Sequence, residues 1–219
     1  MNTNVNVQTH GLAINSVLKN TYQLLSATLL FSGLMAYLSM ALELPYFGLL
    51  ITLGGYFGLL FLTHKLKNSA GGIFAVFALT GFMGLTLGPI IGSYLGAFSN
   101  GAELVTMAMT GTGVIFLSLS FYAITSQKDF SFMSGFLMVG IIVAFLAGLA
   151  AYFFQIPALS LTVSAAFILL MSGLILFETS NIIHGGERNY IMATVTLYVS
   201  IYNLFLSLLH LLGVFSGDD

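Results

Sequence analysis

The chain has 219 residues, of which 58% are hydrophobic and only 5% are charged, whereas a soluble domain carries about 25% charged residues. A water-soluble fold cannot bury so much apolar surface, so this composition indicates an integral membrane protein. Five basic and seven acidic residues give a formal net charge of −2, which excludes the basic surface that a nucleic-acid partner requires. The absence of cysteine excludes disulfide bonds, thiolate metal sites and cysteine nucleophiles.

Seven apolar runs follow one another along the chain. A bilayer core about 30 Å thick needs about 20 such residues in a helix, and continuous rather than alternating apolarity favours helices over barrel strands. The polar N-terminus lacks the basic region of a signal peptide, so we expect the first run to be retained. The predicted helices are Thr21–Leu42, Tyr46–Thr63, Gly71–Leu95, Leu104–Ile124, Ser131–Phe154, Pro157–Ile183 and Ile191–Val214. The sequence therefore predicts an all-α, seven-helix transmembrane bundle.

Basic residues occupy every second connection. Lys and Arg are retained on the cytoplasmic side of membranes, which predicts a cytoplasmic N-terminus and an external C-terminus. We expect a cytoplasmic polar tail at 1–20, one transmembrane domain at 21–214 and a short external tail at 215–219. No connection exceeds about ten residues, which leaves no room for a soluble catalytic module. The basic residues are Lys19, Lys65, Lys67, Lys128 and Arg188, and the other connections carry Glu43 and Glu103.

Glycines recur at four-residue spacing in the third run, at Gly84, Gly88, Gly92 and Gly96. Small residues on one helical face let a neighbouring backbone approach closely, which favours helix association in lipid. The alternative is a hinge at Gly88-Pro89, because proline removes a helix hydrogen bond. We favour packing over the hinge.

The seventh run carries a polar stripe of Thr196, Ser200, Asn203, Ser207 and His210. Spacings of three and four residues place these side chains on one helical face. Because lipid leaves such groups unpaired, the stripe predicts a central last helix that turns this face toward other helices. Interhelical hydrogen bonding is the interpretation we favour, and a polar path lining a pore is the alternative.

Glu178 is the acidic residue with apolar helix on both sides. An ionisable group inside a membrane is a functional-site hypothesis by default. Counted from Pro157, Glu178 lies about 30 Å along its helix, near the cytoplasmic edge, so an interfacial carboxylate that reaches water is the alternative. Burial would raise the pKa of this carboxyl, whereas exposure would not.

Enzymatic and metal chemistry find no support in the sequence. Glu178 and His184 are six residues apart and do not share a helical face as an HExxH pair does, and no ligand cluster joins them and Glu187. A solvated loop histidine is the interpretation we favour for His184. No serine stands in the GxSG signature of rhomboid-type proteases. We expect no catalytic residue, no cofactor and no metal.

The stretch ILFETSNIIHGGERNYIMATVTLYVSIYNLFLSLLHLLG resembles the signature end of the Bax inhibitor-1 family, in particular its bacterial YccA-like branch. The opening VLKNTYQLLSATLLFSG, the segment FALTGFMGLTLGPIIGSYL and the loop QKDFSFMSGFLM are similar to the same branch. The resemblance covers essentially the whole chain, and ETSNIIHGGE is its most specific part. It implies a seven-helix protein of the bacterial inner membrane, with its N-terminus cytoplasmic and its C-terminus periplasmic.

The resemblance also implies a partner, because YccA-like proteins are regulators of FtsH, a membrane-anchored ATP-dependent protease. Other family members are pH-sensitive calcium leak channels that use an acidic pair on the last two helices. Glu178 in FETSN matches the first acid, but Ser200 in LYVSIYNLF stands where the second would fall. Two close carboxylates titrate as a coupled pair, whereas one glutamate beside a serine does not.

We therefore place regulation of an FtsH-type protease first. The polar tail from Met1 to Asn20 is the predicted flexible handle for an ATP-driven unfoldase. A cation leak for calcium or protons is second, with Glu178 as the gate and Ser200 and Asn203 lining the path.

Overall fold

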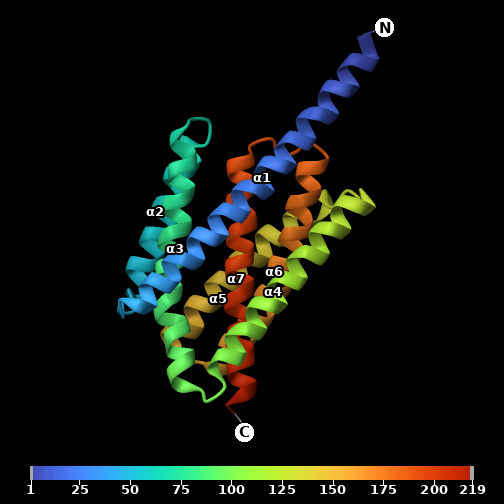
Figure 1. Ribbon diagram of the computed structural model, residues 1–219. Coiled ribbons are helices and arrows are strands. Elements are labelled where there is room, and N and C mark those ends of the chain that lie inside the picture. Colours follow the sequence, from blue (N-terminus) through green and yellow to red (C-terminus); the bar gives the residue numbers. More distant parts are fainter. Residues whose placement is uncertain (1, 218–219) are drawn as a thin grey trace. The chain divides into compact units, whose positions relative to one another are not determined.

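The structure is a computed structural model that describes residues 2–217, with the backbone alone described for 2–15. Seven of its helices are long and apolar enough to cross a membrane, as predicted (Figure 1). Their bounds are α1 Asn2–Ala41, α2 Gly48–Leu66, α3 Gly71–Ala97, α4 Gly101–Ser126, α5 Ser134–Phe154, α6 Pro157–Ile183 and α7 Tyr190–Ser216, and a short 3₁₀ helix, η1, covers Ser131–Met133 before α5.

The first helix is longer than predicted. Helix α1 begins at Asn2, not near Thr21, although its candidate membrane span is Ser16–Ala41. The backbone of residues 2–20 is therefore helical and continuous with the apolar part of α1. Hydropathy identifies only the apolar part of a helix, so it does not predict that the helix continues into a polar segment. Met1, Asp218 and Asp219 lie outside the described residues.

Local chemistry explains several helix ends. Pro157 opens α6 at a position where its missing N–H is not needed, and it follows Ile156 in extended conformation. Asn189 caps α7, because its Oδ1 accepts hydrogen bonds from the backbone N–H groups of Ile191 and Met192, both at 3.1 Å. Gln127 ends α4 in the left-handed region at φ 53°, with its N–H donating to Ala123 O.

The chain forms two compact units, and each is described by itself. Unit 1 comprises the residues up to Gly96 together with Gly185–Tyr198, so it contains α1, α2, nearly all of α3 and the start of α7. Unit 2 comprises the residues from Ala97 to His184 and those from Val199 onward, so it contains α4, η1, α5, α6 and the rest of α7. The last helix thus contributes to both cores, as expected for a central helix.

Unit 1 is held together by a buried tyrosine of α7. The Tyr198 hydroxyl lies 2.6 Å from Ser32 Oγ of α1 and donates to Thr80 O of α3 at 3.2 Å. In the same unit, Thr194 Oγ1 lies 3.2 Å from Thr21 O of α1 and 2.7 Å from Tyr190 O of its own helix. These contacts tie α1, α3 and α7 together.

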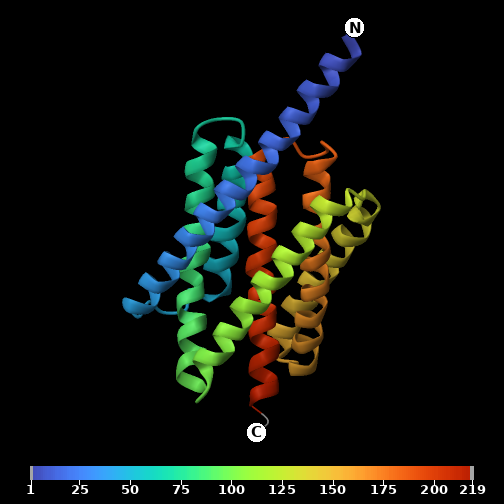
Figure 2. The same ribbon diagram turned by 45° about the vertical axis from the view of Figure 1, so that its right-hand side comes forward.

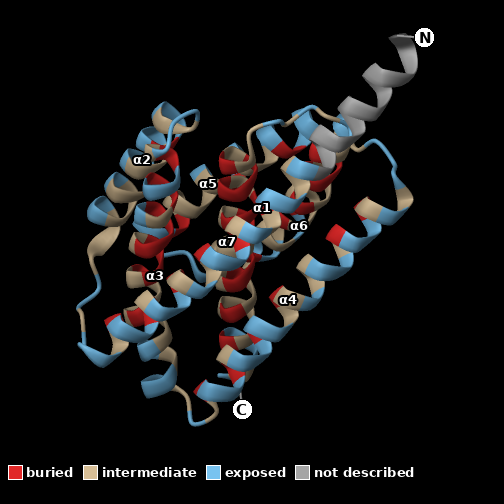
Figure 3. Cartoon of the chain, turned by 45° about the horizontal axis from the view of Figure 1, so that its top comes forward, coloured by how far each residue is buried: buried red, intermediate tan, exposed pale blue. Residues whose placement is uncertain are grey.

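In unit 2, α6 packs against both α4 and α5, and the α5–α6 pair is visible as adjacent helices (Figure 2). Ile175 of α6 and Leu204 and Leu209 of α7 are fully buried. Buried positions recur along α7 (Figure 3). Large apolar side chains such as Leu169 remain exposed, as expected for surfaces that face lipid.

Candidate functional site

Glu178 is buried near the end of α6, with only 5% of its surface exposed. Thr179 and Ser180, which follow it, are buried as well. The interfacial alternative, in which the carboxylate reaches water, is therefore wrong for this structure. A buried acid of this kind is the natural centre of a candidate site.

Ser200 and Asn203 belong to the same unit as Glu178. Ser200 is completely buried, whereas Asn203 is half-buried. The Asn203 side-chain amide donates to Val199 O at 2.8 Å within α7, so part of its hydrogen-bonding capacity is used locally. Unit 2 thus contains all three residues that the sequence nominated for a polar path.

The far end of the α7 stripe makes an interhelical hydrogen bond, as the favoured interpretation predicts. His210 Nδ1 lies 2.7 Å from Ser164 Oγ of α6. A pocket of about 430 Å³ adjoins this pair and is lined by residues from the end of α5, the start of α6 and the end of α7, including Tyr152, Gln155 and Ser160.

A buried serine of α4 was missed by the sequence reasoning. Ser120 Oγ is buried and has no hydrogen-bond partner. Ser120 lies seven residues before Gln127, which is about 10 Å along α4. Glu178 lies six residues before His184, which is about 9 Å along α6. His184 Nε2 and Gln127 O are 3.2 Å apart, so Ser120 and Glu178 are at similar depth. Ser118, two residues earlier, is exposed, and nothing in the local sequence distinguishes the two.

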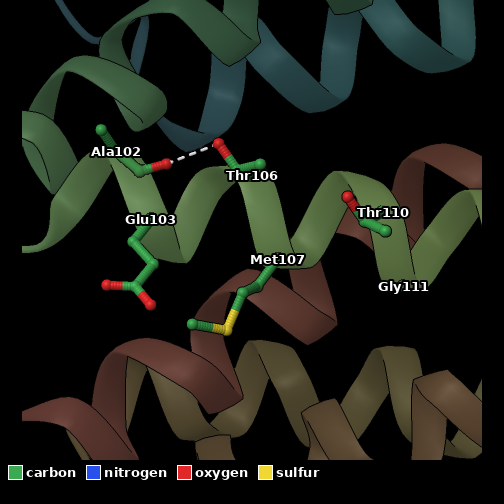
Figure 4. Close-up of a pocket in the computed structure, with 6 residues that line it drawn as sticks. All are labelled: Ala102, Glu103, Thr106, Met107, Thr110 and Gly111. Carbon is green, nitrogen blue, oxygen red and sulfur yellow. Dashed lines mark hydrogen bonds between the residues drawn. The ribbon is translucent and has the colours of Figure 1, made fainter.

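A second pocket, of about 480 Å³, lies along α4 and includes Glu103. The side chains of Glu103, Thr106, Met107 and Thr110, drawn in Figure 4, are three or four residues apart and share one face of α4. Thr106 Oγ1 also donates to Ala102 O at 2.8 Å. Every residue that lines this pocket belongs to α4, so no second element contributes a polar group to it, and the pocket is a weaker candidate for a ligand site.

His184 is exposed, as predicted for a loop histidine, but it is not merely solvated. It takes part in a hydrogen-bond network with Ser180 and the connection between α4 and η1. Within the residues whose side chains are described, no group of three His, Cys, Asp or Glu residues could hold a metal ion.

Seven long apolar helices define a polytopic membrane protein, and one of them carries a buried acid, Glu178. Residues 14–217 match the family model described as "Inhibitor of apoptosis-promoting Bax1". The chain belongs to this family, the Bax inhibitor-1 family.

The chain is also similar to bacterial relatives over nearly its whole length. The chain is 53% identical to the Escherichia coli K12 protein named modulator of FtsH protease YccA, over 96% of this chain and 95% of that one. It is 55% identical to an uncharacterised Pseudomonas aeruginosa protein, over 94% of this chain and 92% of the relative. A YccA of another E. coli strain, also 53% identical over 96% of this chain and 95% of its own, is named an inner membrane protein.

These matches place the chain among multi-pass inner-membrane proteins. The names describe regulators, an inhibitor and a modulator, which agrees with the expectation that the chain is not an enzyme.

Proposed function

We propose that this protein binds a membrane-anchored protease of the FtsH type and restrains its activity. The observation that carries the proposal is 53% identity over 96% of the chain to the E. coli modulator of FtsH protease. Near-complete coverage of both chains means that the resemblance concerns the whole transmembrane protein and not one shared segment.

The surface of α2 supports a partner within the bilayer. Of its residues only Thr63 is buried, and Leu50 and Phe61 are 86% and 70% exposed. A helix so little covered by its own chain can contact another membrane protein as readily as lipid.

Affinity purification in mild detergent tests the partner. We expect an FtsH-type protease to co-purify in near-stoichiometric amount with the tagged chain, and not with an unrelated tagged inner-membrane protein at equal abundance. Recovery of the protease at the level of that control would contradict the proposal.

The N-terminal segment is our proposed handle for the protease. Residues 2–15 belong to α1 and precede its candidate membrane span, Ser16–Ala41, and Asn20 is exposed. An ATP-driven unfoldase needs an accessible terminal segment to engage. Deleting residues 2–11 should lengthen the lifetime of the protein or change the degradation of other protease substrates. If both stay unchanged, the segment is not a handle.

A cation leak is the second candidate, because Glu178, an acid within an apolar helix, belongs to the same unit as Ser200 and Asn203 of α7. In this hypothesis Glu178 is the titrating gate, and Ser200 and Asn203 line the path. Conduction also needs a continuous wetted path and sites that release the ion. Ser200 adds no charge to hold a divalent ion, so this function stays behind protease restraint.

Purified protein in liposomes loaded with a calcium dye tests the leak. A pH-dependent flux that Glu178→Gln abolishes would support it, and Ser200→Asp should increase the flux at neutral pH by supplying a second acid. Absence of flux, or flux that Glu178→Gln leaves unaltered, would remove this function.

A further inference from the structure

Two connections of unit 1 are joined by a side chain at the end of the unit where α3 and α7 begin (Figure 1). The Asn189 Nδ2 donates to Lys67 O at 3.0 Å and to Asn68 Oδ1 at 2.9 Å. Asn189 precedes α7, whereas Lys67 and Asn68 lie between α2 and α3. Because Arg188 is the residue before Asn189, this contact brings a lysine and an arginine from distant parts of the sequence to one place.

Two further basic residues belong to the same end of unit 1. Lys65 lies in the last turn of α2, two residues before Lys67. On α7, Thr194 Oγ1 lies 3.2 Å from Thr21 O of α1, and Lys19 is two residues before Thr21, toward the start of α1. Four of the five basic residues of the chain thus form one surface, which we call the basic rim: Lys19, Lys65, Lys67 and Arg188.

Acidic residues do little to neutralise the basic rim. Within the side chains that the structure describes, no carboxylate forms an ion pair with a rim residue. Glu187 is the acid nearest to Arg188 in sequence, but its Oε1 accepts from the Asn189 backbone N–H at 2.6 Å. Glu43, the other acid of unit 1, follows the opposite end of α1. The rim therefore presents a surplus of positive charge to an external partner.

The depth of the basic rim favours a lipid as that partner. The candidate span of α2 ends at Leu66, between Lys65 and Lys67, and that of α7 begins two residues after Arg188. Lipid headgroups lie immediately outside the hydrocarbon core that such spans cross. Arginine matches the geometry of a phosphate with paired hydrogen bonds, and lysine binds it as a point charge. Side chains at this depth meet lipid phosphates without any change in the fold.

We propose that the basic rim binds the headgroup of an anionic phospholipid, with Lys67 and Arg188 contacting its phosphate and Asn189 holding their two connections together. Lys19 and Lys65 add electrostatic attraction for the same headgroup. The site distinguishes lipids by net charge, because a zwitterionic headgroup also places a cation against the rim.

Native mass spectrometry of the full-length protein in mild detergent tests the site. The probes are phosphatidylglycerol, which is anionic, and phosphatidylcholine, which is zwitterionic, titrated separately. We expect phosphatidylglycerol to bind more tightly. Lys67→Gln and Arg188→Gln should each raise its dissociation constant roughly fivefold, the factor that one basic residue near an anionic membrane surface typically represents. Neither change should affect the binding of phosphatidylcholine as strongly.

Two control variants separate a built site from a simple effect of net charge. Lys128→Gln removes the same charge from the remaining basic residue, which is exposed beside Asp129 in unit 2, and should leave phosphatidylglycerol binding unchanged. Asn189→Ser retains a side-chain oxygen that can cap α7 but loses both amide donors. It should weaken phosphatidylglycerol binding although the formal charge stays the same. SDS titration verifies that each variant is folded.

Equal affinity for the two lipids would overturn the proposal, as would a loss of affinity in Lys128→Gln as large as that in Arg188→Gln. Wild-type affinity in Asn189→Ser would show that its hydrogen bonds do not assemble the site. If Arg188→Gln retains full lipid binding and instead loses a co-purifying protein, the basic rim contacts a protein partner, and the lipid site is likewise refuted.

Discussion

Pro89 interrupts the hydrogen bonding of α3 without interrupting the helix. Proline has no N–H to give to the carbonyl four residues earlier, which is that of Leu85. Ser39 of α1 supplies the missing donor, with Oγ 2.8 Å from Leu85 O. Gly88 makes this possible, because a Cβ there would collide with the Ser39 side chain. Ser39, Gly88 and Pro89 therefore act together, because the glycine gives the serine room to replace the hydrogen bond that the proline removes. Helix α3 runs continuously from Gly71 to Ala97.

Replacing Ser39 should show that the stability of the protein depends on its hydrogen bond to Leu85 O. Ser39→Ala leaves the Leu85 carbonyl without its donor, so we expect a loss of about 1–3 kcal/mol in the free energy of unfolding, measured by SDS titration in mixed micelles. In a Pro89→Ala background the helix regains its own N–H, and the same substitution should cost less. Ser26→Ala, at an exposed position of α1 whose hydroxyl bonds within its own helix, is the control. If Ser39→Ala lowers the free energy of unfolding equally with and without Pro89, Ser39 does not compensate for the proline.

Loss of the Tyr198 hydroxyl should likewise destabilise unit 1. Tyr198→Phe removes the bonds to Ser32 and Thr80 O and leaves the ring in place. Buried polar groups that lose a partner typically cost about 1–3 kcal/mol, so the unfolding transition should occur at lower SDS fraction. Tyr37→Phe changes an exposed tyrosine of α1 and should have little effect. A transition unchanged by Tyr198→Phe would show that the hydroxyl does not stabilise the unit.

At the scale of elements, the glycine stripe was only partly predicted. A Cβ at Gly84 would collide with the Ser32 carbonyl of α1, whereas Gly92 and Gly96 have nothing within 4 Å. Packing is therefore correct for Gly84 and Gly88 and wrong for the two later glycines. The reason is the length of the neighbouring helix, because α1 ends at Ala41, about half a turn beyond Ser39, which meets Gly88. Periodicity identifies a face but not where its partner helix stops.

A pair of alanine substitutions on α3 measures this difference. Gly84→Ala should destabilise the protein by about 1–3 kcal/mol, as overpacking typically does. Gly92→Ala meets open space and should be neutral or stabilising by up to about 1 kcal/mol, because alanine has the better helix propensity. SDS titration provides both values. Equal effects at the two positions would show that α1 does not pack on this face.

In the candidate site too, the sequence identifies unusual residues but not the elements that pack against them. Glu178 and the stripe of α7 could be nominated because ionisable and polar residues are conspicuous among apolar ones. The network at His184 could not, because its partners are backbone carbonyls of Gln127 and Lys128 that no sequence pattern marks. The partner-free hydroxyl of Ser120 also depends on which face of α4 is buried.

At the scale of the whole molecule, the basic residues constrain the orientation of the chain. Lys19 lies in the N-terminal half of α1 and Lys65 in the last turn of α2. Lys67, Lys128 and Arg188 lie in the connections that follow α2, α4 and α6. The three intervening connections carry no Lys or Arg. Lys128 and His184 thus belong to the same side of the membrane, because α4 and α6 end there together.

We expect the N-terminus to be cytoplasmic and the C-terminus periplasmic, because short connections rich in Lys and Arg are retained inside and the described chain has seven candidate spans. A fluorescent protein fused to the N-terminus should be bright, and alkaline phosphatase fused after Asp219 should be active. Single cysteines provide a second test with an impermeant thiol reagent. Ser69→Cys, between α2 and α3, should react only after the membrane is permeabilised. Ser99→Cys should react in intact spheroplasts. Both serines are exposed, so only their side of the membrane distinguishes them. Both termini on one side would require an even number of spans and would contradict the bundle, whereas a complete inversion would retain seven spans and show that the basic residues do not set the orientation.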